Sequence, residues 1–206
     1  MKIFAIGMNY ALHNQELNGT LEKPLSPVIF LKAETALSQG GQPFSRPNDM
    51  GRIDYEAEIV IHFCKTGKDI PQSQANNYYD KVTIGIDFTA RDLQAQFKKK
   101  GHPWDIAKGF DGSAAIGEWI AKNSLPDIQN LSFHLNIDGK TVQRGHSSDM
   151  MYSVDEIISF ISHFYTITPG DILYTGTPVG VGPVFPGNHL QGYIEDQKLL
   201  DFYVQS

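Results

Sequence analysis

Short apolar runs separated by glycine and proline follow one another along most of the chain. Within several runs apolar and polar residues alternate, which is the two-residue period of a half-buried strand. Gly and Pro occupy 19 and 11 of the 206 positions and are spread between the runs as turn residues. This pattern predicts strands at residues 2–7, 28–33, 53–63, 82–88, 132–137, 171–175, 190–195 and 199–204.

Helical periodicity is confined to three segments, residues 10–17, 89–100 and 153–165. The last segment begins with the capping-box spacing of Ser153 and Glu156 and places its isoleucines on one face. Strands without regular helical crossovers argue against a doubly wound α/β fold. The pattern therefore predicts an α+β, mainly β roll in which the 206 residues form a single domain.

Composition narrows the class of protein. The hydrophobic fraction of 41% and the charged fraction of 19% are ordinary for a globular protein, and the net charge of −6 argues against nucleic-acid binding. The basic run at residues 98–100 fits the last turn of a helix ended by Gly101. Cys64 is the only cysteine, and the N-terminal apolar run is too short for a signal peptide or membrane span. We therefore expect a cytoplasmic protein with no membrane partner.

Two acidic segments predict a metal site. Glu56 and Glu58 lie two residues apart in the strand predicted at 53–63, so they share a face about 6.5 Å apart at Cα. In a neighbouring strand Asp87 lies opposite the apolar face, beside Gly85. A buried carboxylate needs a partner or a metal. The three carboxylates predict a site for Mg²⁺ or Mn²⁺, whereas the two glutamates alone could belong to a solvated strand face.

Two further pairs of residues could supply a reaction beside such an ion. His13 and Glu16 stand at i and i+3 of the first predicted helix, where a carboxylate orients an imidazole as a general base. Such a pair could equally be a surface contact. Arg91 and Gln94 follow Asp87 on one side of the next helix, and an arginine fork matches a substrate carboxylate.

A lysine and a glycine-rich loop complete the candidates. Lys108 lies among apolar residues, where an unpaired ammonium is costly, so we expect it beside an anionic substrate or paired with Asp105 or Asp111. The strand predicted at 171–175 runs into a glycine-rich loop that carries the hydroxyl of Thr177. Such a loop suits an anion or forms a plain turn. It is not a P-loop, because no Gly-Lys-Ser/Thr follows.

Taken in order, these segments resemble the fumarylacetoacetate hydrolase family. The chain has the length of the short acylpyruvase-like members. It departs from the family pattern at Met8, where many members carry Arg, at Asn188, and at residues 62–64. The matching blocks are Gly7-x-Asn9-Tyr10-x-x-His13-x-x-Glu16, Asp54-Tyr55-Glu56-Ala57-Glu58, Gly85-x-Asp87-x-x-Ala90-Arg91-Asp92-x-Gln94, Lys108-Gly109-Phe110-Asp111 and Gly170-Asp171-x-x-x-Thr175-Gly176-Thr177-Pro178-x-Gly180-Val181-Gly182.

The resemblance implies a mixed β-roll, a homodimer and a metal-dependent reaction on a small 2-oxo acid. The implied ligands of Mg²⁺ or Mn²⁺ are Glu56, Glu58 and Asp87. The implied catalytic residues are His13, Glu16 and Lys108. The implied substrate-binding residues are Arg91, Gln94 and Thr177.

The implied reaction is hydrolysis of a C–C bond in an acylpyruvate-type β-diketo acid. His13 would take a proton from the attacking water, and pyruvate would leave as an enolate that the metal and Lys108 stabilise. Decarboxylation or isomerisation of oxaloacetate, or of 2-oxo and 2-hydroxy dienedioic acids, is the alternative at the same site. A metal-dependent protein that binds an oxo acid without turnover is the alternative of another class.

Overall fold

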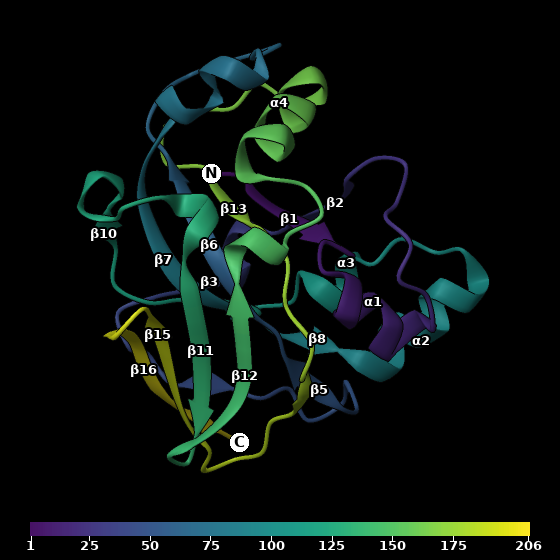
Figure 1. Ribbon diagram of the computed structural model, residues 1–206. Coiled ribbons are helices and arrows are strands. Elements are labelled where there is room, and N and C mark those ends of the chain that lie inside the picture. The colour runs from purple at the N-terminus through teal and green to yellow at the C-terminus, as the bar shows by residue number, and fades with distance from the viewer.

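An eight-stranded mixed sheet is the largest element of the computed structural model, which describes residues 1–206 apart from the side chain of Asn18. Its strand order is β2-β1-β13-β6-β7-β9-β3, and β10 pairs with β7 (Figure 1). The pairs β1·β13 and β3·β9 are parallel, and the others are antiparallel. The strands are β1 (Ile3–Gly7), β2 (Val28–Lys32), β3 (Leu37–Ser38), β6 (Ala57–Phe63), β7 (Tyr79–Asp87), β9 (Ala114–Ile116), β10 (Ile120–Ala121) and β13 (Ile172–Tyr174).

Two smaller sheets complete the roll. A five-stranded sheet in the order β12-β11-β15-β16-β4 contacts β6 and β7, and a three-stranded sheet has the order β14-β5-β8. The mixed, curled sheets confirm the predicted mainly β roll. The strands are β4 (Phe44–Ser45), β5 (Ile53–Tyr55), β8 (Thr89–Ala90), β11 (Ser132–Ile137), β12 (Lys140–His146), β14 (Gly182–Pro183), β15 (His189–Ile194) and β16 (Gln197–Gln205).

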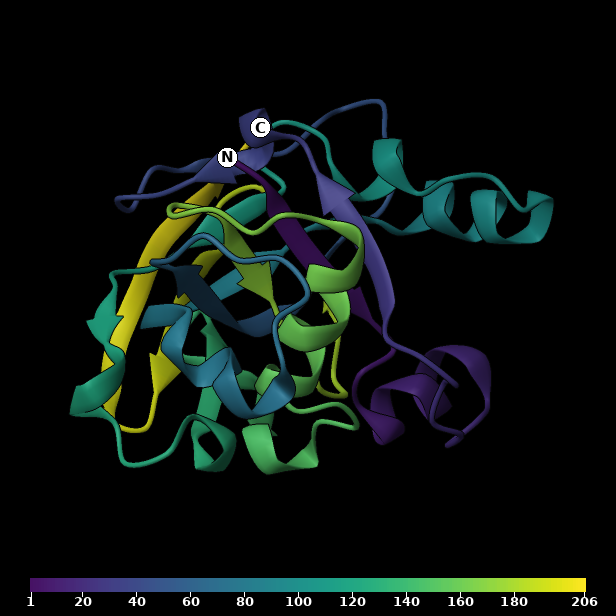
Figure 2. The same ribbon diagram turned by 90° about the horizontal axis from the view of Figure 1, so that it is seen from above.

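Four short α-helices lie around the sheets: α1 (Ala11–Asn18), α2 (Arg91–Lys100), α3 (Asp105–Lys108) and α4 (Val154–Phe164). The helices α1, α2 and α3 lie on one side of the molecule, and α4 lies at one end of it (Figure 1). Seen from above, α2 projects away from the sheets (Figure 2). None of the helices in the described chain has the length and apolar character needed to cross a membrane.

The local signals that predicted two of the helices are present. Ser153 and Glu156 form the expected capping box at the start of α4. Gly101 ends α2 in the left-handed conformation, with a φ of 67°. The helix α2 begins two residues later than predicted, because residues 89–90 pair with β5 as β8.

The predicted strand at 53–63 is corrected by the structure. It is interrupted at Glu56, so β5 belongs to the three-stranded sheet and β6 to the large one. The neighbouring strand is likewise interrupted, between β7 and β8. Both segments therefore pass from the large sheet to the three-stranded sheet at the same place. The bond from Asp87 N to Glu56 O, at 2.8 Å, spans this corner. Glu56 and Asp87 therefore lie where the two sheets meet.

Both faces of the large sheet are covered. The apolar face of β7, with Val82, Ile84 and Ile86, lies in the main core. On the opposite face Val60 and Tyr174 belong to a second buried cluster. Acidic side chains on that second face are therefore kept from water by the fold.

Candidate active site

Three carboxylates meet at the corner between the two sheets. One oxygen each of Glu56, Glu58 and Asp87 lies within 4.8 Å of the others, and the residues are 4%, 2% and 1% exposed. The register of β6 against β7 places Glu58 opposite Gly85 and brings Glu56 beside Asp87. The predicted convergence of these carboxylates is confirmed. The alternative of a solvated strand face is wrong, because the second apolar cluster covers that face.

The cluster has the chemistry that a divalent cation requires. Burial, together with the charges of Asp87 and Glu56, raises the pKa of Glu58 well above its usual value. Oδ1 of Asp87 is also buried, and it lies 2.7 Å from the Lys32 ammonium. Hard cations take carboxylate oxygens as ligands, and each such oxygen offers more than one lone pair. These three residues therefore fit a divalent cation.

Lys108 extends from the end of α3 into this cluster and is 3% exposed. Its Nζ donates to Glu56 Oε2 at 2.7 Å, to Asp87 Oδ2 at 2.8 Å and to Thr89 Oγ1 at 2.7 Å. Burial acts to lower the pKa of Lys108, but Asp87 and Glu56 outweigh it and raise that pKa. The predicted pairing with Asp105 or Asp111 is wrong, because the carboxylates at the sheet corner take all of its ion pairs in the described structure.

A second lysine, which sequence reasoning missed, lies under the cluster. Lys32 ends β2, and its Nζ lies 2.7 Å from Asp87 Oδ1 in an ion pair. The same Nζ donates to the backbone oxygens of Lys108 and Ser113. Burial lowers the pKa of Lys32. A lysine ending the apolar run at 28–32 was the available signal, because an ammonium in an apolar strand needs a partner.

Arg91 and Gln94 reach the site from the first turns of α2. Arg91 Nη1 donates to Gln94 Oε1 at 2.8 Å, Nε donates to Asp54 Oδ2 at 2.8 Å, and Nη2 contacts Glu56. Asp54 is fully buried and was not predicted as part of the site. Burial acts to raise the pKa of Glu56, but Lys108 and Arg91 outweigh it and hold that pKa well below its usual value.

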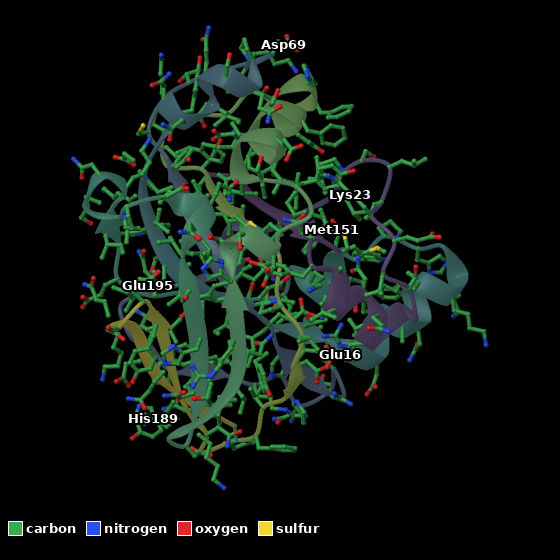
Figure 3. All side chains as sticks on the ribbon, viewed as in Figure 1. Glu16, Lys23, Asp69, Met151, His189 and Glu195 are labelled. Carbon is green, nitrogen blue, oxygen red and sulfur yellow. The ribbon has the colours of Figure 1, made fainter. Side chains whose placement is uncertain are left out.

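His13 and Glu16 lie on α1, as predicted. His13 Nδ1 is 3.4 Å from Glu16 Oε2, and His13 is 7% exposed. Burial lowers the pKa of His13, with Glu56 and Glu16 acting in the opposite direction. The Glu16 carboxylate also accepts from Gly180 N at 3.2 Å. Figure 3 shows Glu16 on the side of α1 that faces the loop after β13. His13 of this pair is therefore buried, whereas Glu16 is exposed.

One small cavity brings most of the predicted residues together. It has a volume of about 30 Å³ and is bounded on its apolar side by Phe30, Leu17 and Trp104. Met8, whose backbone is left-handed with a φ of 62°, also lines it. The polar residues that line the cavity are His13, Asn14, Glu56, Arg91, Gln94, Lys98 and Lys108.

The glycine-rich loop after β13 contacts the cluster through its backbone. Gly176 N donates to Glu58 Oε2 at 2.7 Å, so a carboxylate of the chain itself occupies this donor. Thr177 Oγ1 donates to Ala57 O at 2.9 Å, between the two glutamates. The loop thus lies beside the site as predicted, with the Thr177 hydroxyl proton directed at the protein backbone.

The comparison with protein families identifies the family of the chain. The family model described as the C-terminal part of fumarylacetoacetate (FAA) hydrolase matches residues 2–204. The chain belongs to the fumarylacetoacetate hydrolase family. The resemblance predicted from the sequence motifs is therefore confirmed.

Similar members of the fumarylacetoacetate hydrolase family carry several activities. The mitochondrial oxaloacetate tautomerase of Arabidopsis thaliana is 36% identical over 204 residues, which are 99% of this chain and 91% of that protein. The solved fumarylpyruvate hydrolase of Pseudomonas aeruginosa, in complex with Mn²⁺ and pyruvate, has a TM-score of 0.93 and 33% identity, covering 100% of this chain and 89% of its own. The 2-hydroxyhepta-2,4-diene-1,7-dioate isomerase of Mycobacterium marinum has a TM-score of 0.85 and 33% identity, covering 99% and 74%.

Proposed function

We propose that this chain is a divalent-metal-dependent enzyme that hydrolyses a C–C bond in an acylpyruvate-type 2-oxo acid. The observation that carries the proposal is the sharing of one cavity by Glu56 of the carboxylate cluster, His13, Arg91 and Lys108. A metal ligand, a base and two cations beside one small space are what cleavage of an anionic oxo acid requires.

Glu56, Glu58 and Asp87 would hold Mg²⁺ or Mn²⁺. When bound, the ion would supply Lewis-acid polarisation of the 2-oxo group. The three ligands are supported by their mutual approach within 4.8 Å and by their burial. The Mn²⁺ in the similar fumarylpyruvate hydrolase is consistent with this choice of ion.

His13 would act as the general base. Its lowered pKa favours the neutral imidazole, and in the tautomer with Nδ1–H directed at Glu16, Nε2 would take a proton from water. The water oxygen adds to the distal carbonyl of the substrate. The C–C bond then breaks, its electron pair passes into the enolate of pyruvate, and protonation of that enolate releases pyruvate and a carboxylate.

Lys108 and Arg91 would compensate the charge of the substrate. Lys108 places an ammonium at the cavity wall, where negative charge develops on the oxo-acid oxygen as the bond breaks. Nη1 and Nη2 of Arg91 each make one contact within the chain, so each retains an N–H for a substrate carboxylate. Gln94 and the backbone beside Thr177 would complete the substrate contacts.

Tautomerisation or decarboxylation of oxaloacetate is the second candidate. His13 and Lys108, the two groups that could move a proton, line the same cavity beside Phe30 and Trp104. The name of the similar plant tautomerase points to the same substrate. In this reaction His13 or Lys108 would move a proton at the carbon beside the oxo group, and no water would attack.

A substrate panel with His13→Ala tests the proposal. Acylpyruvates, fumarylpyruvate and oxaloacetate are assayed with Mn²⁺ and with Mg²⁺ in H₂¹⁸O. Hydrolysis puts ¹⁸O into the new carboxylate, and His13→Ala should lose on the order of 10²–10⁴-fold in rate. Gln15→Ala, exposed on the same helix, is the control and should keep the rate.

Other outcomes of the panel separate the alternatives. Conversion of oxaloacetate without any hydrolysis of an acylpyruvate would favour the second candidate. Saturable binding of oxalate with no turnover of any substrate would leave only an oxo-acid-binding protein.

We further propose that the 206 residues act as one catalytic domain in a cytoplasmic homodimer. The family resemblance of the sequence supports the dimer. Light scattering coupled to size exclusion measures its mass directly.

A further inference from the structure

Gln143 is a buried polar residue on the inward face of β12, and it is 2% exposed. Its Oε1 accepts from Ala57 N at 2.9 Å. Its Nε2 donates to Thr177 Oγ1 and to Pro178 O, both at 2.9 Å. The opposite orientation of the amide would set donor against donor at Ala57 and leave the oxygen of Pro178 without this donor. The three partners therefore fix the direction of this side chain.

Ala57 is the residue between Glu56 and Glu58, and side chains bind both of its backbone groups. Its N–H donates to Gln143, and its carbonyl accepts from Thr177 Oγ1 at 2.9 Å. Because Gln143 also donates to Thr177, these bonds form a closed ring around the peptide segment that joins the two glutamates.

The ring replaces a missing strand. The pairing of β13 with β6 ends at Val60, and one further backbone bond runs from Thr175 N to Ile59 O at 3.2 Å. Beyond it, Ala57 has no strand partner on that side. Buried backbone groups without partners cost free energy. Thr175 Oγ1 donates to Ile59 O at 2.8 Å, and the ring supplies the partners at Ala57. Side chains thus continue the ladder along the stretch that carries two of the three carboxylates.

The same contacts set the position of the Glu58 carboxylate. Gly176 N donates to Glu58 Oε2, and Gly176 directly precedes Thr177, which the Gln143 amide holds. An N–H fixed in this way fixes the oxygen that it binds. Gln143 is therefore linked to Glu58 through the loop and to both glutamates through Ala57.

We propose that Gln143 is a positioning residue of the metal site, which sets the spacing and direction of Glu56 and Glu58. The inference rests on the proposed binding of a divalent cation by these carboxylates. The Thr177 hydroxyl, which the family resemblance assigns to substrate binding, would then also position the metal ligands. It donates its proton to Ala57 O, and its oxygen accepts from Gln143 Nε2.

Titration of Mn²⁺ into the metal-free full-length protein tests this proposal. Gln143→Leu and Thr177→Val should each weaken Mn²⁺ binding about 10–100-fold, because residues that orient metal ligands have effects of this size. Thr177→Ser restores the hydroxyl and should bind within about threefold of wild type. Urea unfolding of each metal-free variant measures how much of the change is loss of stability.

Ser162→Ala is the control for a purely structural role. Ser162 is fully buried in α4, and its hydroxyl bonds Ile70 N and Ser159 O, away from the carboxylates. This variant should lose stability and keep its Mn²⁺ affinity. Unchanged Mn²⁺ affinity in Gln143→Leu and in Thr177→Val would overturn the inference. If Gln143→Leu does not fold, the pair Thr177→Val and Thr177→Ser decides alone. A wild-type protein that binds no Mn²⁺ would instead contradict the proposed function.

Discussion

Lys108 carries a positive charge into the space that a cation would also occupy. It lies between Glu56 and Asp87, while Lys32 lies against the other oxygen of Asp87. Two ammonium groups beside three carboxylates reduce the negative charge that a metal ion meets. The same groups raise the positive potential at the cavity wall, where an anionic substrate would bind. The two lysines are therefore expected to strengthen binding of an anionic substrate and to weaken binding of the metal ion.

Replacement of Lys108 separates these two effects. Lys108→Met should bind Mn²⁺ about tenfold more tightly than wild type, because a neighbouring positive charge is gone. Turnover should fall, because the ammonium no longer stabilises the developing oxyanion. Calorimetric titration and steady-state kinetics measure the two changes. Lys100→Met, exposed at the end of α2, should change neither. Weaker Mn²⁺ binding in Lys108→Met would contradict this account.

The residues that sequence reasoning found share a short-range signal. Glu56 and Glu58 are two apart in the predicted strand, and His13 and Glu16 are three apart in the predicted helix, so each pair is expected to share a face. Lys32 and Gln143 have no partner at such a spacing, because the residues that they contact are distant in sequence. Their roles depend on how β2 and β12 pack, which local spacing does not contain.

Among the elements, β1 and β13 form a parallel pair that Asp171 holds together. Its carboxylate accepts from Lys2 N at 2.7 Å and from Thr168 N at 2.8 Å, and it pairs with Lys2 Nζ at 2.7 Å. Burial acts to raise the pKa of Asp171, but these bonds from Lys2 and Thr168 hold it below its usual value. Asp171 therefore has a structural task at the end of β13 away from the glycine-rich loop.

Asp171→Ala should cost about 3 kcal/mol of unfolding free energy at pH 7, because two backbone donors lose a buried acceptor and Lys2 loses its ion pair. The wild-type carboxylate stabilises the fold above the pKa of an unfolded aspartate, about 3.9. This contribution is lost as the pH falls through the lowered pKa of the folded protein. Urea unfolding at several pH values should show the difference between the two proteins shrinking below about pH 4.

The exposed turn residue Asp196 gives the matched control. Asp196→Asn should stay within about 0.5 kcal/mol of wild type. An equally small effect of Asp171→Ala at pH 7 would refute the assigned role.

The elements predicted well from sequence are those with a strict period. β7 alternates apolar and polar residues, and α4 has both an apolar face and a capping box. The strand β12 was missed because its inward residue is Gln143, which hides the alternation. The break at Glu56 was missed because the pattern of residues 53–63 continues through it. Only the pairing of β5 with β8 and β14 reveals the change of sheet.

At the scale of the whole molecule, the site is assembled from distant stretches of chain. The base comes from α1, the carboxylates from β6, β7 and the corner before β6, and the cations from β2, α2 and α3. A cavity of about 580 Å³ lies elsewhere, between Gly40, Trp119 and residues 198–202. None of the predicted site residues lines this cavity. The candidate site is therefore identified by the chemistry of its side chains and not by the size of its cavity.

The central claim is that a divalent cation at Glu56, Glu58 and Asp87 is required for turnover of a 2-oxo acid. The most direct test is the rate of acylpyruvate loss in chelated protein as Mn²⁺ is added back, in wild type and in Asp87→Ala. The account predicts no turnover after chelation, saturable recovery with Mn²⁺ in wild type, and no recovery in a folded Asp87→Ala. Full activity of the chelated wild type, or recovery in Asp87→Ala equal to that of wild type, would contradict it.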